Sequence, residues 1–339
     1  MLRLVANRVV SSVLSLFGAS LFSFIILRLT PGDPARLFLG PFATEAAVAQ
    51  LRGKLGVDDP IPLQYLAYIG DFLRGDWGFS YTTGEPVVRE LMERLPATLE
   101  LGLCAFAFAV CGAVPLALVA VHHHGRAADR AALAFSFFGL GVPTFWFGLM
   151  LLVLFFERLG WLPGPDGRLS LNVAPPSVTG LYTVDALLAG QWAKFLDAAR
   201  HLILPAITLG MAPLGFLTRL LRANLLDLAR EPFILVARSR GVSRWAALVR
   251  HALPNACLPA LTAAGLLFGQ LLAGSLLVER VFNWPGAGAL VAEGVLRQDF
   301  SVAQAFILLS AVMYVLAMMV VDLLAGLIDP RIRHPMTLE

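Results

Sequence analysis

The sequence has few charged residues and few cysteines, and each shortage excludes a class of protein. Asp, Glu, Lys and Arg make up only 14% of its 339 residues, hydrophobic residues make up 58%, and the mean hydropathy is +0.75. A soluble domain cannot bury that much apolar surface, so we predict an integral membrane protein. The three cysteines, Cys104, Cys111 and Cys257, are too few and too widely spaced for a disulfide framework or a zinc site.

Motifs for catalysis and nucleotide binding are also lacking. The pair Gly53-Lys54 is followed by Leu55 and has no glycine at the upstream spacing of a phosphate-binding loop, and neither H-E-x-x-H nor G-x-S-x-G occurs. We therefore predict that the chain is not an enzyme and holds no cofactor of its own. Acidic residues that could relay protons inside the membrane are scarce, which argues against a secondary transporter. Asp322, near the inner end of the last apolar run, is expected to anchor that run.

Three consecutive histidines, His122 to His124, do not form a convincing metal site. Successive helical side chains point about 100° apart, and no nearby carboxylate or cysteine completes a ligand set. A polar cap at the membrane interface is the simpler interpretation. The net charge of +3 gives no reason to expect a nucleic-acid partner.

Six apolar runs are long enough to cross a bilayer as helices. The first follows Arg3 and Arg8 but is longer than the apolar part of a signal peptide, so we interpret it as an uncleaved span. The chain is thus predicted to be all-α with six transmembrane helices, at Val9–Leu27, Leu101–Val121, Ala131–Phe156, Leu202–Thr218, Ala252–Val278 and Ser301–Val321.

The positions of the arginines predict the orientation. The segment from Arg219 to Arg250 contains seven arginines against Asp227 and Glu231, a net charge of +5, and should be cytoplasmic. The loops at 30–96 and 157–200 then face outward, and both termini lie in the cytoplasm. The first outer loop should be folded, because 44–55 and 62–73 have helical periodicity, and Pro96 is expected to start the next helix with Glu100 in its first turn.

The stretch Glu231–Pro259 is basic and cannot cross the membrane. Pro232 suits a first helical turn, Gly241 can end that helix in a left-handed conformation, and Ser243 can cap a second helix. Pro254 is expected to end the second helix. An amphipathic hairpin results, and a simple interpretation is a basic loop resting on anionic lipid.

Two apolar segments carry glycine and proline where a pathway could be lined. Pro143 should kink the third span. The run Val281–Leu290 is too short to cross, so it is predicted to be a hairpin at the outer mouth. In the second outer loop, Ala186–Ala199 is amphipathic and is expected to help cover that mouth. Packing alone explains such segments about as well as a pathway does.

Several of these stretches resemble the dipeptide, oligopeptide and nickel branch of ABC importer permeases, most of all its B-type dipeptide permeases. The hairpin resembles the family's "EAA" coupling loop through Ala237, Gly241 and Leu253-Pro254, although Leu235 and Val236 replace the first two residues of that motif. Further matches are LTPGDPA at 29–35, GDWGFS at 75–80, RLPATLEL at 94–101, PTFWFG at 143–148, FNWPGAG at 282–288 and PRIRH at 330–334.

The resemblance implies a type I importer permease in the bacterial inner membrane that forms half of a translocation pathway by alternating access. Implied partners are a homologous C-type permease, two cytoplasmic ATPases that bind ATP and Mg²⁺, an extracytoplasmic solute-binding protein and membrane lipid. It implies a coupling loop at 222–256, inside a permease core at 97–330 that follows an N-terminal part at 1–96 and precedes a tail at 331–339. Implied ATPase-coupling residues are Phe233, Ala237, Arg238, Arg240, Gly241, Arg244, Leu253 and Pro254, and pathway candidates are Pro143, Phe145, Trp146, Trp284 and Pro285.

The solute stays open among dipeptides, longer peptides, glutathione, nickel and metallophores. Three functions from other classes also remain: a secondary transporter, a membrane enzyme and a structural scaffold.

Overall fold

The computed structural model describes residues 2–29, 36, 39, 43–54, 56, 58–170 and 173–328. Within these residues the chain is helical, with one isolated antiparallel bridge between Phe79 and Pro86, so the predicted all-α fold is confirmed. Most of the LTPGDPA motif and the 331–339 tail lie outside the described residues, as does the side chain of Asp322. The chain forms two compact units, one of residues 96–289 and 313 onward, the other of 2–95 and 290–312.

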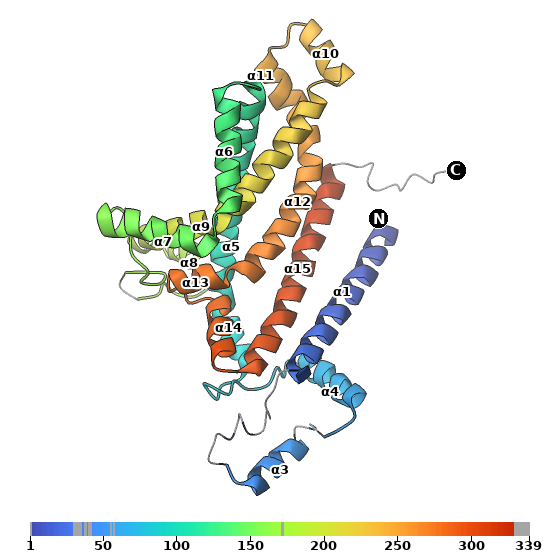
Figure 1. Ribbon diagram of the computed structural model, residues 1–339, viewed down its shortest axis with the longest axis vertical. Helices are drawn as coiled ribbons and strands as arrows, with labels where there is room; N and C mark the ends of the chain where they lie inside the picture. The colour runs from blue at the N-terminus through green and yellow to red at the C-terminus, as the bar shows by residue number, and fades with distance from the viewer. Residues whose placement is uncertain are drawn as a thin grey trace. The chain divides into compact units, whose positions relative to one another are not determined.

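The unit of 2–95 and 290–312 contains the N-terminal helix and the folded first loop (Figure 1). Its helices are α1 (Leu2–Leu29), α3 (Glu45–Lys54), α4 (Ile61–Leu73), the start of α5 (Val87–His122), most of α14 (Ala287–Leu296) and the first part of α15 (Phe300–Ile328). The two helices predicted at 44–55 and 62–73 are confirmed. Tyr65 of α4 packs edge-on against Phe24 of α1, and its hydroxyl lies 2.7 Å from that of Ser20.

The buried carboxylate of Asp299 holds the loop that precedes α5. It accepts hydrogen bonds from the Ser80 hydroxyl at 2.6 Å and from the Thr82 backbone N–H at 3.2 Å. α5 then begins at Val87, and Val87 and Leu91 are fully buried. The prediction that Pro96 starts this helix is wrong. The turns before the proline are packed in the core, so the helix already begins at Val87.

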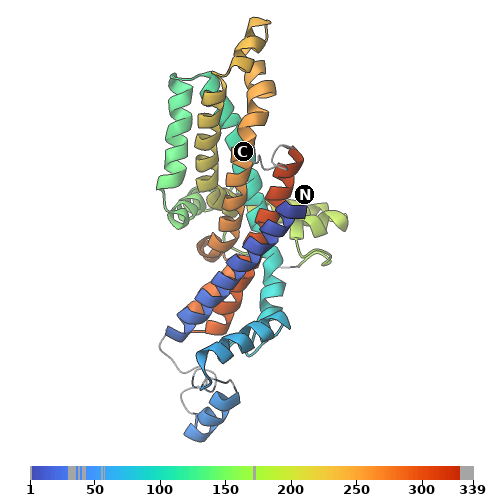
Figure 2. The same cartoon turned by 90° about the vertical axis from the view of Figure 1, so that its right-hand side faces the viewer.

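The unit of 96–289 and 313 onward holds the rest of the helices. In chain order they are the remainder of α5, α6 (Ala127–Gly141), α7 (Thr144–Leu151), the π-helical η1 (Leu152–Arg158), α8 (Tyr182–Leu188), α9 (Trp192–Leu228), α10 (Pro232–Ser239), α11 (Arg244–Ala247), the π-helical η2 (Leu248–Ala252), α12 (Leu253–Gly274), α13 (Leu276–Val281) and the end of α15. Figures 1 and 2 show α10 and α11 at one end of this unit and α7, α8 and α13 toward the other.

Helix α9 is the centre of that unit and contacts α6, α7, α8 and α12. Its most apolar 18-residue stretch is 78% buried, whereas the corresponding stretches of the other long apolar helices are 28% to 39% buried. Gly215 permits a close approach of α6, because a Cβ there would lie 2.5 Å from the Ser136 carbonyl oxygen. The predicted fourth span, Leu202–Thr218, is the buried middle of this 37-residue helix.

Among the residues that the structure describes, four helices are long and apolar enough to cross a membrane, and a bent pair would make a fifth. The four are Val87–His122, Trp192–Leu228, Arg244–Ala273 and Phe300–Val321, and the pair is α6 with α7 and η1. α1 is a 28-residue helix whose described apolar part is Val10–Ile25. The count of six crossings and the sidedness of the termini stay predictions.

Candidate coupling site

The first helix of the basic hairpin ends at a glycine, as predicted. Gly241 has a φ of +88°, a left-handed conformation that glycine adopts without steric cost. Its N–H donates to the Arg238 carbonyl at 3.0 Å, and the Val242 N–H donates to the Ala237 carbonyl at 3.2 Å. This pair of bonds satisfies the carbonyls that end α10 and reverses the chain. Gly241 and Arg240 are exposed at the tip, and Ala237 is half-buried.

The second half of the hairpin continues into the next apolar helix, so the prediction that Pro254 ends it is wrong. Ser243 caps α11 by accepting from the Ala246 N–H at 3.2 Å. From Arg244 the helix runs unbroken to Ala273, with π-helical geometry over η2. Pro254 lies in the first turn of α12, where the wider π turn before it accommodates a residue without an N–H.

Three buried side chains fix the hairpin to the body of the unit. Ile234 of α10 is 2% exposed, Ala247 is 1% exposed and Leu248 is 3% exposed. They belong to one apolar cluster with Val121 of α5 and Leu225 of α9. Both halves of the hairpin are therefore packed against the helices from which the chain enters and leaves it.

The outward face of α10 is apolar and basic. Phe233, Leu235 and Val236 are 44%, 53% and 50% exposed, and they neighbour the exposed Arg238 and Arg240. Among the residues that the structure describes, neither arginine forms an ion pair. Exposed apolar side chains rimmed by charge are typical of a surface that binds another protein.

Arg244 links the hairpin to the end of α5. Its guanidinium Nη2 donates at 3.1 Å to the Val121 carbonyl in the last turn of α5, which also accepts from the His124 N–H at 3.2 Å. Beside it, the Trp245 ring meets the His122 ring edge-on at 5.4 Å. The predicted coupling residue Arg244 thus also has a structural contact.

The turn after the three histidines is tied to α9 by a buried ion pair. Asp129 accepts from Arg222 Nε at 2.6 Å and Nη2 at 2.8 Å, and from the Gly125 N–H at 2.9 Å. His124 Nδ1 lies 3.1 Å from the same carboxylate. In the described part of the chain no group of three His, Cys, Asp or Glu side chains could hold a metal ion. Ninety-three residues separate Asp129 from Arg222, so no local pattern predicts the pair.

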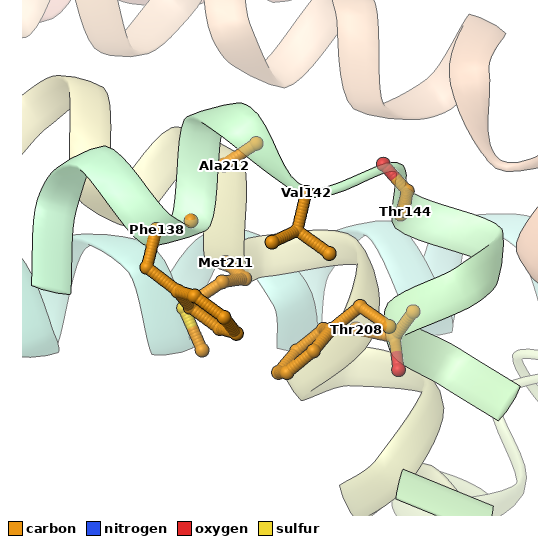
Figure 3. Close-up of a pocket in the computed structure, with 8 residues that line it drawn as sticks. Phe138, Val142, Thr144, Thr208, Met211 and Ala212 are labelled. Atoms are coloured by element: carbon orange, nitrogen blue, oxygen red, sulfur yellow. The ribbon is translucent and has the colours of Figure 1, made fainter. Parts of the chain in front are cut away.

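The predicted kink at Pro143 is a sharp bend. α6 ends at Gly141, α7 begins at Thr144, and their axes differ by 107°. Pro143 occupies the position before α7, where its missing N–H costs nothing. Figure 3 shows Val142 in this bend, beside Thr208 and Met211 of α9, in a small crevice that these residues line.

The two predicted pathway segments lie together but present different surfaces. α7 contacts α13, and a Cβ on Gly148 would lie 3.1 Å from the Phe282 ring. Phe145 and Trp146 of α7 are 45% and 46% exposed. Trp284 is instead 1% exposed, and its indole N–H donates to the Ala97 carbonyl at 2.9 Å, so in this conformation it lines no open surface. Pro285 beside it is exposed.

A buried carboxylate that sequence reasoning missed organises the same region. Glu279 of α13 has no exposed surface and accepts from the Thr98 hydroxyl at 2.8 Å, the Ser275 hydroxyl at 2.7 Å and the Ala289 N–H at 2.7 Å. Thr98 in turn accepts from the Ala287 N–H at 2.8 Å. Glu279 therefore joins α5, the end of α12 and the Pro-Gly turn before α14.

A second buried pair fastens the loop between η1 and α8 to α5. Arg168 donates to Glu100 at 2.5 Å, both side chains are less than 10% exposed, and the guanidinium stacks on the Tyr182 ring at 3.4 Å. Glu100 also accepts from the Thr183 N–H and hydroxyl at 2.8 and 2.7 Å. The predicted role of Glu100 at a helix start is wrong, because α5 begins thirteen residues earlier and Glu100 instead forms an ion pair.

Asp185 closes the turn that leads into α8. It accepts from the backbone N–H groups of Val178, Thr179 and Gly180 and from the Thr179 hydroxyl. Burial by itself raises the pKa of Asp185, but these hydrogen bonds outweigh it and hold the pKa below its usual range. The amphipathic piece expected at Ala186–Ala199 is divided here between α8 and the first turns of α9.

Comparison with known protein families matches nearly the whole chain. The family described as "Binding-protein-dependent transport system inner membrane component" matches residues 113–334, and the N-terminal family of the same transport systems matches residues 1–102.

Curated relatives cover the chain from end to end. The di/tripeptide transport system permease protein DppB of Pseudomonas aeruginosa (strain UCBPP-PA14) is 41% identical over 98% of this chain and 99% of its own length. The probable D,D-dipeptide transport system permease protein DdpB of Escherichia coli (strain K12) is 42% identical, covering 94% of each chain. The dipeptide transport system permease protein DppB of the same strain is 38% identical over 98% of this chain and 99% of its own length.

Proposed function

Because the chain belongs to the family of inner membrane components of binding-protein-dependent transport systems, we propose that it is the permease subunit of an importer for di- and oligopeptides. It is a multi-pass inner membrane protein and a pore-forming component, not an enzyme. Its system includes an ATPase and a solute-binding protein. The names of its relatives favour peptides over nickel, metallophores or glutathione as the solute.

The hairpin of α10, α11 and η2 is the element through which the ATPase acts on this subunit. The proposal rests on the way the hairpin is connected. It exposes Phe233, Arg238 and Arg240 on one side and is packed into the core through Ile234 on the other. Its second half is also continuous with α12. A partner that binds the exposed face can therefore move α12 without an intervening loop. A soft connection would absorb such a movement before it reached the membrane.

The full assembly pairs this chain with a homologous C-type permease, two ATPases that hold ATP and Mg²⁺, and an extracytoplasmic binding protein. Closure of the ATPases, transmitted through Phe233 to Leu253, switches the pathway from inward-open to outward-open, and hydrolysis resets it. The bend at Pro143 and the exposed rings of Phe145 and Trp146 support a pathway wall along α7. Trp284 and Pro285 contribute to the adjoining turn.

The substitution Gly241→Asp tests the coupling site against an isosteric control. A Cβ on Gly241 meets no atom of this chain within 4 Å, so a side chain fits the fold itself. Asn and Asp have the same shape, and both tolerate the left-handed conformation better than other residues. We expect Gly241→Asn to keep substantial uptake and ATPase association. Gly241→Asp should reach the membrane but lose both, because it places a negative charge at the tip of the hairpin, beside the exposed basic face of α10.

Peptide uptake and co-purification of the ATPase are measured for both variants in cells that lack the native permease. Normal uptake by Gly241→Asp would refute the coupling assignment. Transport by the purified chain alone in liposomes, driven by an ion gradient, would instead establish a secondary transporter.

A further inference from the structure

A basic cleft lies on the inner side of the hairpin, where α10 and α11 meet α5 and α9. Its volume is about 190 Å³. The residues that line it are Val121, His124, Leu226, Ala229, Arg230, Ile234, Arg238, Arg244, Ala247 and Leu248. The cleft therefore has one basic side and one apolar side, and none of its lining residues is acidic.

The positive charge of the cleft is not neutralised by the described part of the chain. Arg230 and Arg238 form no ion pair with any described residue, and Arg244 donates to a neutral carbonyl, that of Val121. Three arginines line one small space, so their like charges repel one another, and an anion bound there lowers that energy. The fold positions these residues, since Arg230 lies in the turn between α9 and α10, Arg238 on α10 and Arg244 on α11.

We propose that this cleft binds a phosphate group, supplied by the headgroup of an anionic glycerophospholipid. Guanidinium groups bind phosphate through paired N–H bonds, and basic pockets beside membrane helices are suited to phospholipid headgroups. The apolar side, with Leu226 and Leu248, matches the glycerol and first methylene groups of a lipid, which free phosphate lacks. Arg240 and Gly241 of the exposed tip do not line the cleft, whereas Arg238 both lines it and borders the exposed face of α10. The inference does not depend on the identity of the solute or on ATPase coupling.

The test measures lipid binding to the full-length chain purified in detergent. Phosphatidylglycerol, phosphatidylcholine and inorganic phosphate are titrated separately, bound lipid is counted by native mass spectrometry, and phosphate competes in a further titration. One variant combines Arg230→Gln with Arg238→Gln. The charge control is Arg240→Gln, which removes an arginine from the same hairpin but outside the cleft. Ala229→Phe keeps every charge and fills the cleft.

Phosphatidylglycerol should bind in preference to phosphatidylcholine, and the double variant should bind it more weakly by about tenfold or more, because charge-assisted hydrogen bonds are lost. Arg240→Gln should bind as the wild type does, whereas Ala229→Phe should lose binding. Each variant is first shown to elute as one folded species. Saturable displacement by inorganic phosphate alone, with no preference for the lipid, would assign the phosphate site to a soluble ion.

Equal losses in Arg240→Gln and the double variant would overturn the proposal, because they would show a general surface charge. The proposal would also fail if the double variant kept its lipid and lost only its affinity for the ATPase. In that case the cleft accepts acidic side chains of a protein.

Discussion

Replacing Glu279 by Gln changes one oxygen of a buried side chain and should destabilise the protein measurably. The carboxylate accepts three hydrogen bonds of 2.7 to 2.8 Å, two of them at Oε1 and one at Oε2. A Gln side chain keeps the shape but offers only one accepting oxygen. If that oxygen faces the Ala289 N–H, its amide N–H₂ group faces the Thr98 and Ser275 hydroxyls.

Those two hydroxyls cannot both adapt. Thr98 already accepts from the Ala287 N–H and would have to accept a second bond, which leaves its own proton without an acceptor. A buried polar group without a partner costs about 1 to 3 kcal/mol. We therefore expect Glu279→Gln to lower the free energy of unfolding by about 1 to 3 kcal/mol. Glu279→Leu removes both accepting oxygens and should cost more, because it leaves the Thr98 hydroxyl and the Ala289 N–H without this acceptor.

Thermal unfolding of the purified protein in detergent measures this effect. The matched control is Glu293→Gln, the same change at a side chain that is 43% exposed and pairs at 2.7 Å with Arg297, in the turn just after its helix. An exposed pair of this kind contributes less than about 1 kcal/mol. If Glu279→Gln and Glu293→Gln shift the melting temperature equally, the buried network does not stabilise the Pro-Gly turn as argued.

Two further predictions concern the loop between η1 and α8. Glu100→Gln should lower the free energy of unfolding by about 3 to 5 kcal/mol, because it leaves the buried Arg168 charge unpaired. The double variant Glu100→Leu/Arg168→Met should recover stability in the same melting assay. A double variant less stable than either single change would contradict this. The pKa of Asp185 is lower in the fold than in the unfolded chain, so the ionised carboxylate stabilises the fold. That stabilisation is complete above the unfolded pKa of about 3.9 and is lost as the pH falls through the folded-state pKa. Proteolysis of this loop should therefore accelerate under acid in the wild type, while in Asp185→Asn it should be fast at neutral pH too; identical pH profiles would show that Asp185 does not hold the loop.

Local signals predicted the turn of the basic hairpin because adjacent residues decide the geometry of that turn. Gly241 adopts the left-handed conformation and Ser243 caps the following helix, and both effects depend only on the backbone within a few positions. The break at Pro143 was predicted for the same reason, although its angle of 107° exceeds what a proline alone produces in a continuous helix. The larger bend requires α7 to pack on α9 and α13, which a local pattern does not reveal.

Prolines misled the prediction where tertiary packing opposes the local rule. Pro96 and Pro254 both lie inside continuous helices, the first preceded by buried turns at Val87 and Leu91, the second by the π-helical η2. The polar clusters were missed for a different reason. Glu279 and Thr98 are separated by 181 residues, so each looks like an isolated polar residue in the sequence. The available signal was an acid at the end of an apolar run, which applies to Glu279 after 252–278 as well as to Asp322.

The continuity of α11, η2 and α12 gives the hairpin a direct mechanical connection to the buried network at Glu279. The 22 residues of α12 span about 33 Å, and α13 follows after Ser275 alone. At the hairpin end the helix is held by Ala247 and Leu248, and at the far end Ser275 and Glu279 bind each other. Because the helix is continuous and packed at both ends, a displacement of the hairpin is carried along it. Movement of the outward face of α10 should therefore reorient the Pro-Gly turn at Pro285. Because α7 contacts α13, α7 should move with that turn, so that the two predicted pathway segments move as one.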